Sequence, residues 1–81
     1  MKSLEIKNKV ERAAILLDGD YNETNSGVPR IIYKKDAVTA SIVYAAKSDR
    51  WKVFFPFPAS IQKKEYFDNI DQVKEWLQSW E

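Results

Sequence analysis

Apolar residues recur with helical spacing near the start of the chain. The repeat is formed by Ile6, Val10, Ala13, Ala14 and Leu17. These positions fall on one stripe of a helix with 3.6 residues per turn. The pattern predicts an amphipathic helix over Leu4–Asp18, with Ser3 as its cap and Gly19 ending it.

The middle of the chain alternates between apolar and polar residues and predicts three strands. The first covers Val28–Lys34, the second Ala37–Ala46, and the third is the aromatic run Arg50–Pro58. Short polar turns at Lys35-Asp36 and Lys47–Asp49 separate them. Connections of this length predict an antiparallel meander.

A second helix is expected at the end of the chain. Asn69 and Gln72 form a capping-box pattern, with Asp68 as the alternative cap. The apolar stripe that follows is Ile70, Val73, Leu77 and Trp80, with Trp76 at its margin. Two polar segments, Asp20–Gly27 and Ala59–Phe67, are expected to be connections.

These elements predict a single α+β domain over residues 1–81. Its order is α-β-β-β-α, a three-stranded antiparallel meander with an N-terminal and a C-terminal helix. Each helix is apolar on one side only, so we expect both helices to pack on one face of the sheet.

The third strand defines the two faces of the predicted sheet. Strict alternation separates Trp51, Val53, Phe55 and Phe57 from Lys52, Phe54 and Pro56. We expect the first set to be core and Phe54 to face away from the helices. Ile31-Ile32-Tyr33 is apolar throughout, so either Ile32 or the Ile31/Tyr33 pair faces outward.

The outward face is the predicted binding site. Its partner-binding residues are expected to be Phe54, Val43, Lys52, Tyr33 and Ser41. Val43 and Phe54 are expected to be cross-strand neighbours, or nearly so. An exposed apolar spot of this kind is typical of a partner surface. The alternative is that one of the two connections covers it, with Tyr66 and Phe67 supplying the cover.

Composition narrows the chemistry that the chain can perform. The 81 residues include no His and no Cys, which removes the imidazole, the thiolate and the preferred zinc ligands. We therefore expect no enzyme, no cofactor and no metal site. Asp18, Asp20 and Asn22 match calcium-loop positions, but Glu23 replaces the glycine and Pro29 the bidentate glutamate.

Charge and hydropathy give a weak indication of the partner. Thirteen basic and 12 acidic residues leave a net charge of +1, so no global attraction to polyanions is expected. No apolar run reaches the ~18–20 residues of a membrane span. With no signal-peptide pattern at Met1 and no Cys, we expect a cytoplasmic protein without membrane contact.

A protein-binding module is the first functional interpretation: a small inhibitor, adaptor or regulatory subunit that engages a larger protein. In a three-stranded meander the third strand is an edge, so partner binding or self-association by strand addition through Trp51–Phe55 is a further expectation.

Nucleic-acid binding is the alternative. Lys34, Lys35, Lys47 and Arg50 lie at or near predicted turns and are candidates for a basic rim. Phe54 or Tyr33 would act as a platform on which bases stack, and Lys52 and Arg50 would contact the nucleic-acid backbone. The α-β-β-β-α order resembles that of double-stranded RNA-binding domains, and its last four elements resemble the small arm-binding domains of integrases. The last helix, however, starts with the acidic sequence 68–72, where the RNA-binding domains carry lysines.

Overall fold

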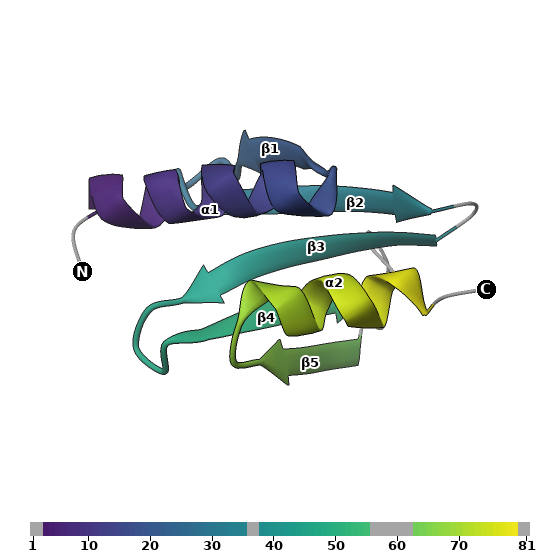
Figure 1. Ribbon diagram of the computed structural model, residues 1–81. Coiled ribbons are helices and arrows are strands. Elements are labelled where there is room, and N and C mark those ends of the chain that lie inside the picture. The colour runs from purple at the N-terminus through teal and green to yellow at the C-terminus, as the bar shows by residue number, and fades with distance from the viewer. Residues whose placement is uncertain (1–2, 36–37, 56–62, 80–81) are drawn as a thin grey trace.

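Two helices and five strands make up the computed structural model, which describes residues 3–35, 38–55 and 63–79. The elements, in chain order, are α1 (Ser3–Leu17), β1 (Asp20–Glu23), β2 (Pro29–Lys35), β3 (Val38–Ala45), β4 (Arg50–Phe55), β5 (Lys63–Phe67) and α2 (Ile70–Gln78). Figure 1 shows both helices side by side over the same face of the sheet.

The sheet is antiparallel throughout, with the strands in the order β1-β2-β3-β4-β5. The predicted α+β class, the two helices and the antiparallel connections are therefore confirmed. The prediction of three strands was wrong, because strands also form within both segments that were expected to be connections. The α-β-β-β-α order, on which the likeness to nucleic-acid-binding domains depended, does not hold.

β1 lies within the predicted loop after the first helix. It pairs with β2, with Tyr21 opposite Ile31. The turn between these strands is closed by hydrogen bonds from the Thr24 amide to the Val28 carbonyl (3.0 Å) and from the Gly27 amide to the Thr24 carbonyl (2.8 Å). Gly27 has a φ of 82°, a conformation that glycine adopts at little cost.

β5 lies at the end of the predicted connection before the last helix. It pairs with β4, with Val53 opposite Glu65 and Phe55 opposite Lys63. β4 is therefore an inner strand between β3 and β5. The expectation of strand addition or self-association through Trp51–Phe55 was wrong, because both edges of β4 are already paired within the chain.

The residue that ends the first helix is Asp18, one position before the glycine that was expected to end it. Asp18 has a φ of 57°, the left-handed conformation common after a helix C-terminus. The Gly19 amide then donates to the Ala14 carbonyl at 2.9 Å. Gly19 is required for a different reason: a Cβ atom there would lie 2.6 Å from Cγ2 of Ile31.

The predicted capping box begins α2, with both candidate caps taking part. The Gln72 amide donates to Oδ1 of Asn69 at 3.0 Å, so Asn69 is the cap. The Gln72 side chain reaches back one residue further, and its Oε1 accepts from the Asp68 amide at 2.9 Å. One amide that the helix leaves unpaired, that of Gln72, and the amide of the residue just before the cap are satisfied in this way.

The core lies between the sheet and the two helices. Its buried apolar side chains are Val10, Ala13, Ala14 and Leu17 from α1, Ile31 from β2, Ala40 and Ile42 from β3, Trp51 and Val53 from β4, and Val73 and Leu77 from α2. The predicted stripes of both helices thus face the sheet. Phe57 and Trp80 lie outside the described residues.

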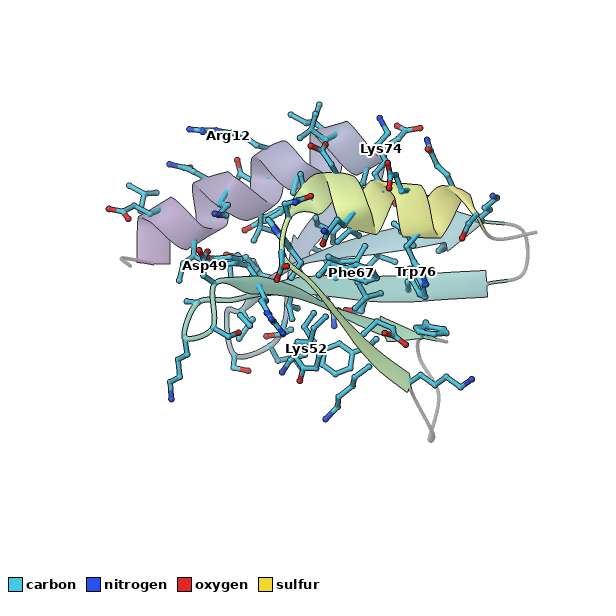
Figure 2. All side chains as sticks on the ribbon, turned by 60° about the horizontal axis from the view of Figure 1, so that its bottom comes forward. Arg12, Asp49, Lys52, Phe67, Lys74 and Trp76 are labelled. Carbon is cyan, nitrogen blue, oxygen red and sulfur yellow. The ribbon has the colours of Figure 1, made fainter. Side chains whose placement is uncertain are left out.

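Half-buried aromatic rings extend the core beneath α2. The Trp76 ring lies 4.8 Å from that of Phe55 and 5.5 Å from that of Phe67, measured between centroids. Phe67 therefore packs on the helix side of the sheet (Figure 2) and does not cover the outer face, as one alternative had allowed.

We predict that Gly19→Ala lowers the free energy of unfolding by about 1–3 kcal/mol, because the added methyl group overlaps the Ile31 side chain. Urea denaturation measures this loss. Ile31→Ala removes the overlapping Cγ2 atom, so Gly19→Ala should cost less in that background. Equal costs in the two backgrounds would contradict the close approach of Gly19 to Ile31.

Candidate functional site

The sheet face away from the helices, called here the outer face, carries most of the predicted site. Strand register and alternation assign it Asp20, Asn22, Arg30, Ile32, Lys34, Thr39, Ser41, Val43, Ala45, Arg50, Lys52, Phe54, Lys64 and Tyr66. Within the described strands its only carboxylate is Asp20. The outer face is therefore strongly cationic in a chain whose net charge is +1.

The structure brings together four of the five predicted partner-binding residues. Phe54 lies opposite Ser41, and Lys52 lies opposite Val43. Val43 and Phe54 are therefore diagonal neighbours on adjacent strands. This agrees with the prediction that they are cross-strand neighbours, or nearly so. Phe54, Val43 and Lys52 are half-buried, whereas Ser41 is only 4% exposed, which leaves its hydroxyl little access to a partner.

Tyr33 does not belong to this group. It pairs with the buried Ala40 and packs against the core on the helix side. The ambiguity of Ile31-Ile32-Tyr33 is thereby resolved: Ile32 faces outward, opposite Ser41, and the other two face the helices. The prediction that Tyr33 lies on the outer face, where it would act as a binding residue or stacking platform, was therefore wrong as to its position.

Lysines and aromatic rings are interleaved at the centre of the outer face. The Lys52 ammonium lies 5.6 Å from the ring centroids of both Phe54 and Tyr66. The Lys64 ammonium lies 5.9 Å from that of Phe54. These distances are typical of cation–π contacts, which orient the ammonium groups across the rings. In Figure 2, Lys52 lies on the opposite side of the sheet from the helices.

Sequence reasoning missed Tyr66, Lys64 and Arg30 as parts of this surface. Tyr66 is 48% exposed and lies opposite Lys52 on β5. Arg30 shares its row with Val43 and donates from Nε to Oδ1 of Asn22 at 2.6 Å. The spacing of Lys64 and Tyr66, two residues apart, would have placed both side chains on one face of a strand. This pattern was not used because the segment was expected to be a connection.

The four predicted basic-rim residues do not form one cluster. Lys34 lies on the outer face, and Lys47 lies in the hairpin after β3. Arg50 pairs with Asp68, with Nε 3.2 Å from Oδ1. Lys35 donates to the Gln78 carbonyl at 3.2 Å and so links β2 to the end of α2.

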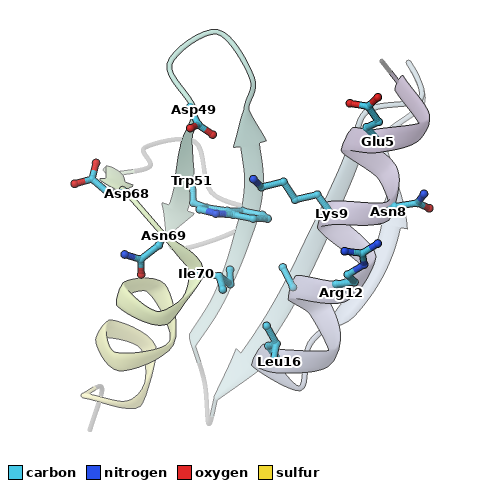
Figure 3. A pocket seen from close by; sticks show the side chains of 11 residues that line it. Glu5, Asn8, Lys9, Arg12, Leu16, Asp49, Trp51, Asp68, Asn69 and Ile70 are labelled. Carbon is cyan, nitrogen blue, oxygen red and sulfur yellow. The ribbon is translucent and has the colours of Figure 1, made fainter. Parts of the chain in front are cut away.

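A groove of about 580 Å³ lies between α1 and the start of α2. Figure 3 shows Trp51 between Lys9 and Arg12 of α1 and Ile70 of α2. Trp51 is only 4% exposed, so it contributes a narrow strip of ring. Leu16 of α1 is 53% exposed and adds to the apolar part of the lining.

The charged groups of this groove are largely engaged within the chain. The Lys9 ammonium lies 4.6 Å from the Tyr44 ring centroid, and Asp68 pairs with Arg50. Asp49 accepts a hydrogen bond from the Tyr44 hydroxyl. The groove therefore presents mixed charges around a small apolar floor, whereas the outer face presents an excess of cations over the one carboxylate of its described strands, Asp20.

Two tyrosines on the helix side have shifted acidities. The hydrogen bond to Asp49, burial and the Asp49 charge raise the pKa of Tyr44 above its ordinary value of 10.0. Burial, followed by the charges of Glu23 and Glu11, raises the pKa of Tyr21. Both phenols are therefore neutral at physiological pH.

Metal sites and membrane spans have structural requirements that can be compared with the part of the chain that the structure describes. No group of three or more carboxylates there is arranged to hold a metal ion. Neither of the two helices is long and apolar enough to cross a membrane. Comparison with protein-family models, with curated proteins and with solved structures gives no match.

The raised pKa of Tyr44 predicts a pH dependence of stability. A phenol that holds its proton more tightly when folded contributes stability below about pH 10, and this contribution is lost as the pH rises further. The free energy of unfolding should therefore fall above about pH 10. Tyr44→Phe should remove part of that fall, as denaturation at successive pH values will measure. An unchanged alkaline slope would contradict this account.

Proposed function

We propose that the chain is a small non-enzymatic binding module, an inhibitor, adaptor or regulatory subunit, and that its outer face engages a protein partner. The observation that carries the proposal is the cluster of Phe54 and Tyr66 with two lysine ammonium groups within 6 Å of their rings. No described helix packs over this cluster (Figures 1 and 2).

The chemistry of the cluster defines the partner surface that fits it. Half-exposed rings favour an apolar or aromatic side chain, since removal of their ring surface from water stabilises the complex. The surrounding ammonium groups favour carboxylates, which increase the association rate and the specificity of binding. The expected partner surface is therefore an apolar centre with acidic neighbours.

Single-stranded nucleic acid is the second candidate. It is favoured by the excess of cations on the outer face, where Arg30, Lys34 and Lys64 join Lys52 and the paired Arg50. α2 packs on the other face of the sheet (Figure 1), but Asp68 of the acidic sequence before it pairs with Arg50 and so reduces the positive charge at that end of the outer face. Each phosphate contact would make the affinity depend on salt.

Two outer-face variants test the protein partner. Phe54→Ala removes the central ring, and Lys52→Glu reverses the charge between the rings. A partner protein that the immobilised unmodified chain captures should not be captured by either variant. Phe54→Ala should weaken the binding of this partner by about 2 kcal/mol or more. Because Phe54 is half-buried, its removal should cost less stability than the ~3–5 kcal/mol of a core phenylalanine.

Lys74→Glu is the matched control. It makes the same charge change on the exposed side of α2, on the opposite side of the molecule from Lys52 (Figure 2). The partner should be retained by this variant as by the unmodified chain. The outer face would be excluded as the binding surface by either of two results. In one, both outer-face variants capture the partner as well as the unmodified chain does; in the other, Lys74→Glu weakens the capture as much as they do.

Fluorescence anisotropy with a random single-stranded nucleic-acid pool tests the second candidate. Binding should weaken as salt is raised and should weaken further in Lys52→Glu and Lys64→Glu, but not in Lys74→Glu. For single strands, each lost phosphate contact should reduce the slope of log affinity against log salt by about 0.7. An absence of binding at low salt would leave the protein partner as the sole candidate.

A further inference from the structure

The sheet has two edge strands, β1 and β5. In the part of the chain that the structure describes, β1 pairs with β2 alone and β5 pairs with β4 alone. An edge strand directs the amides and carbonyls of alternate residues away from the sheet, where they can pair with another strand. In Figure 1, β5 runs along the lower side of the sheet, and no labelled element lies beyond it. β5 therefore offers a free backbone edge.

The side chains of β5 leave this edge accessible. Its first four residues, Lys63 to Tyr66, are exposed, and Phe67 is half-buried. Five extended residues span about 17 Å, an ordinary length for a strand. A segment of similar length from a partner can therefore pair along the whole of β5.

Charge distinguishes the two edges of the sheet. β5 carries Lys63 and Lys64 against the single carboxylate of Glu65. β1, in contrast, carries Asp20 and Glu23 and no basic residue. Like charges on neighbouring strands are destabilising and opposite charges are stabilising. An acidic strand is therefore disfavoured at β1 and favoured at β5, whereas a second basic strand is disfavoured at β5.

The outer face continues onto the β5 edge. Tyr66 lies opposite Lys52 of β4, and Lys64 lies two residues away on the same side of β5. A strand added to β5 would place its outward side chains beside Lys64 and Tyr66, at the ~4.5–5.5 Å spacing of cross-strand neighbours. Carboxylates fit these outward positions. Glu65 points to the helix side of the sheet, so the inward side chains of the added strand should be uncharged.

We propose that the partner binds by strand addition: an extended acidic segment pairs with the free edge of β5 and forms a sixth strand. Main-chain hydrogen bonds supply affinity, and the outward carboxylates select this edge through Lys64 and Lys52. The inference rests on the proposed function, because the added strand extends the outer face that engages the partner protein. Single-stranded nucleic acid has no peptide backbone and cannot pair in this way.

A short synthetic peptide in which glutamate alternates with valine tests the pairing by calorimetric titration. The peptide should bind, whereas the same peptide with lysine in place of glutamate should not. Two further versions carry methyl groups on either the glutamate or the valine backbone nitrogens. Only one of these sets faces β5 in an added strand, so one version should bind at least about tenfold more weakly than the other.

Amide hydrogen exchange of β5 locates the bound peptide. In the free chain, alternate amides of β5 should exchange fast, and the acidic peptide should slow them. Lys64→Glu should weaken the binding of the peptide several-fold. Lys74→Glu, the same charge change on the exposed side of α2, should not.

Three results would overturn strand addition: no binding of the acidic peptide, equal binding of the two methylated versions, or β5 amides that the peptide does not protect. Each of them leaves the outer face free to bind a partner through its side chains alone. Failure of the proposed function would appear elsewhere, as partner capture that Phe54→Ala and Lys52→Glu do not change. The two failures are therefore distinguishable.

Discussion

Burial of Trp51 and Val53 between the sheet and the helices is the constraint on which the rest of the structure depends. β4 is paired on both edges, so its side chains can only lie above or below the sheet. With these two residues at 4% and 0% exposure, alternation directs Lys52 and Phe54 to the outer face. A register shift of one residue would bury a lysine beneath the helices, at a large desolvation cost.

The sequence was most informative where one side of an element is apolar. Both helix stripes and the capping box at Asn69 and Gln72 could be predicted, because burial and unpaired amides impose a regular pattern. β1 and β5 were missed because they are edge strands with mostly exposed side chains. Such strands are held by backbone pairing, which leaves little trace in residue type. For the same reason Tyr66 was not predicted as part of the outer face.

Charge separation between the two faces explains how a chain of net charge +1 can present a strongly cationic surface. Strand alternation collects Arg30, Lys34, Lys52 and Lys64 on the outer face, whereas many of the carboxylates lie on the helices and turns. The net charge is a sum over the whole chain, so it does not reveal that cations and carboxylates lie on different parts of the molecule. The aromatic rings between the lysines add an apolar component, which distinguishes the outer face from an ordinary solvated sheet.

Amide hydrogen exchange of β4, followed residue by residue by NMR, tests the five-stranded sheet most directly. In an inner strand, the amides directed towards β3 and those directed towards β5 are both hydrogen-bonded, so all of them should exchange slowly. If β4 were an edge strand, alternate amides would exchange at rates close to those of an unpaired chain. That result would remove β5, and with it Lys64 and Tyr66, from the outer face, and would contradict the binding surface described above.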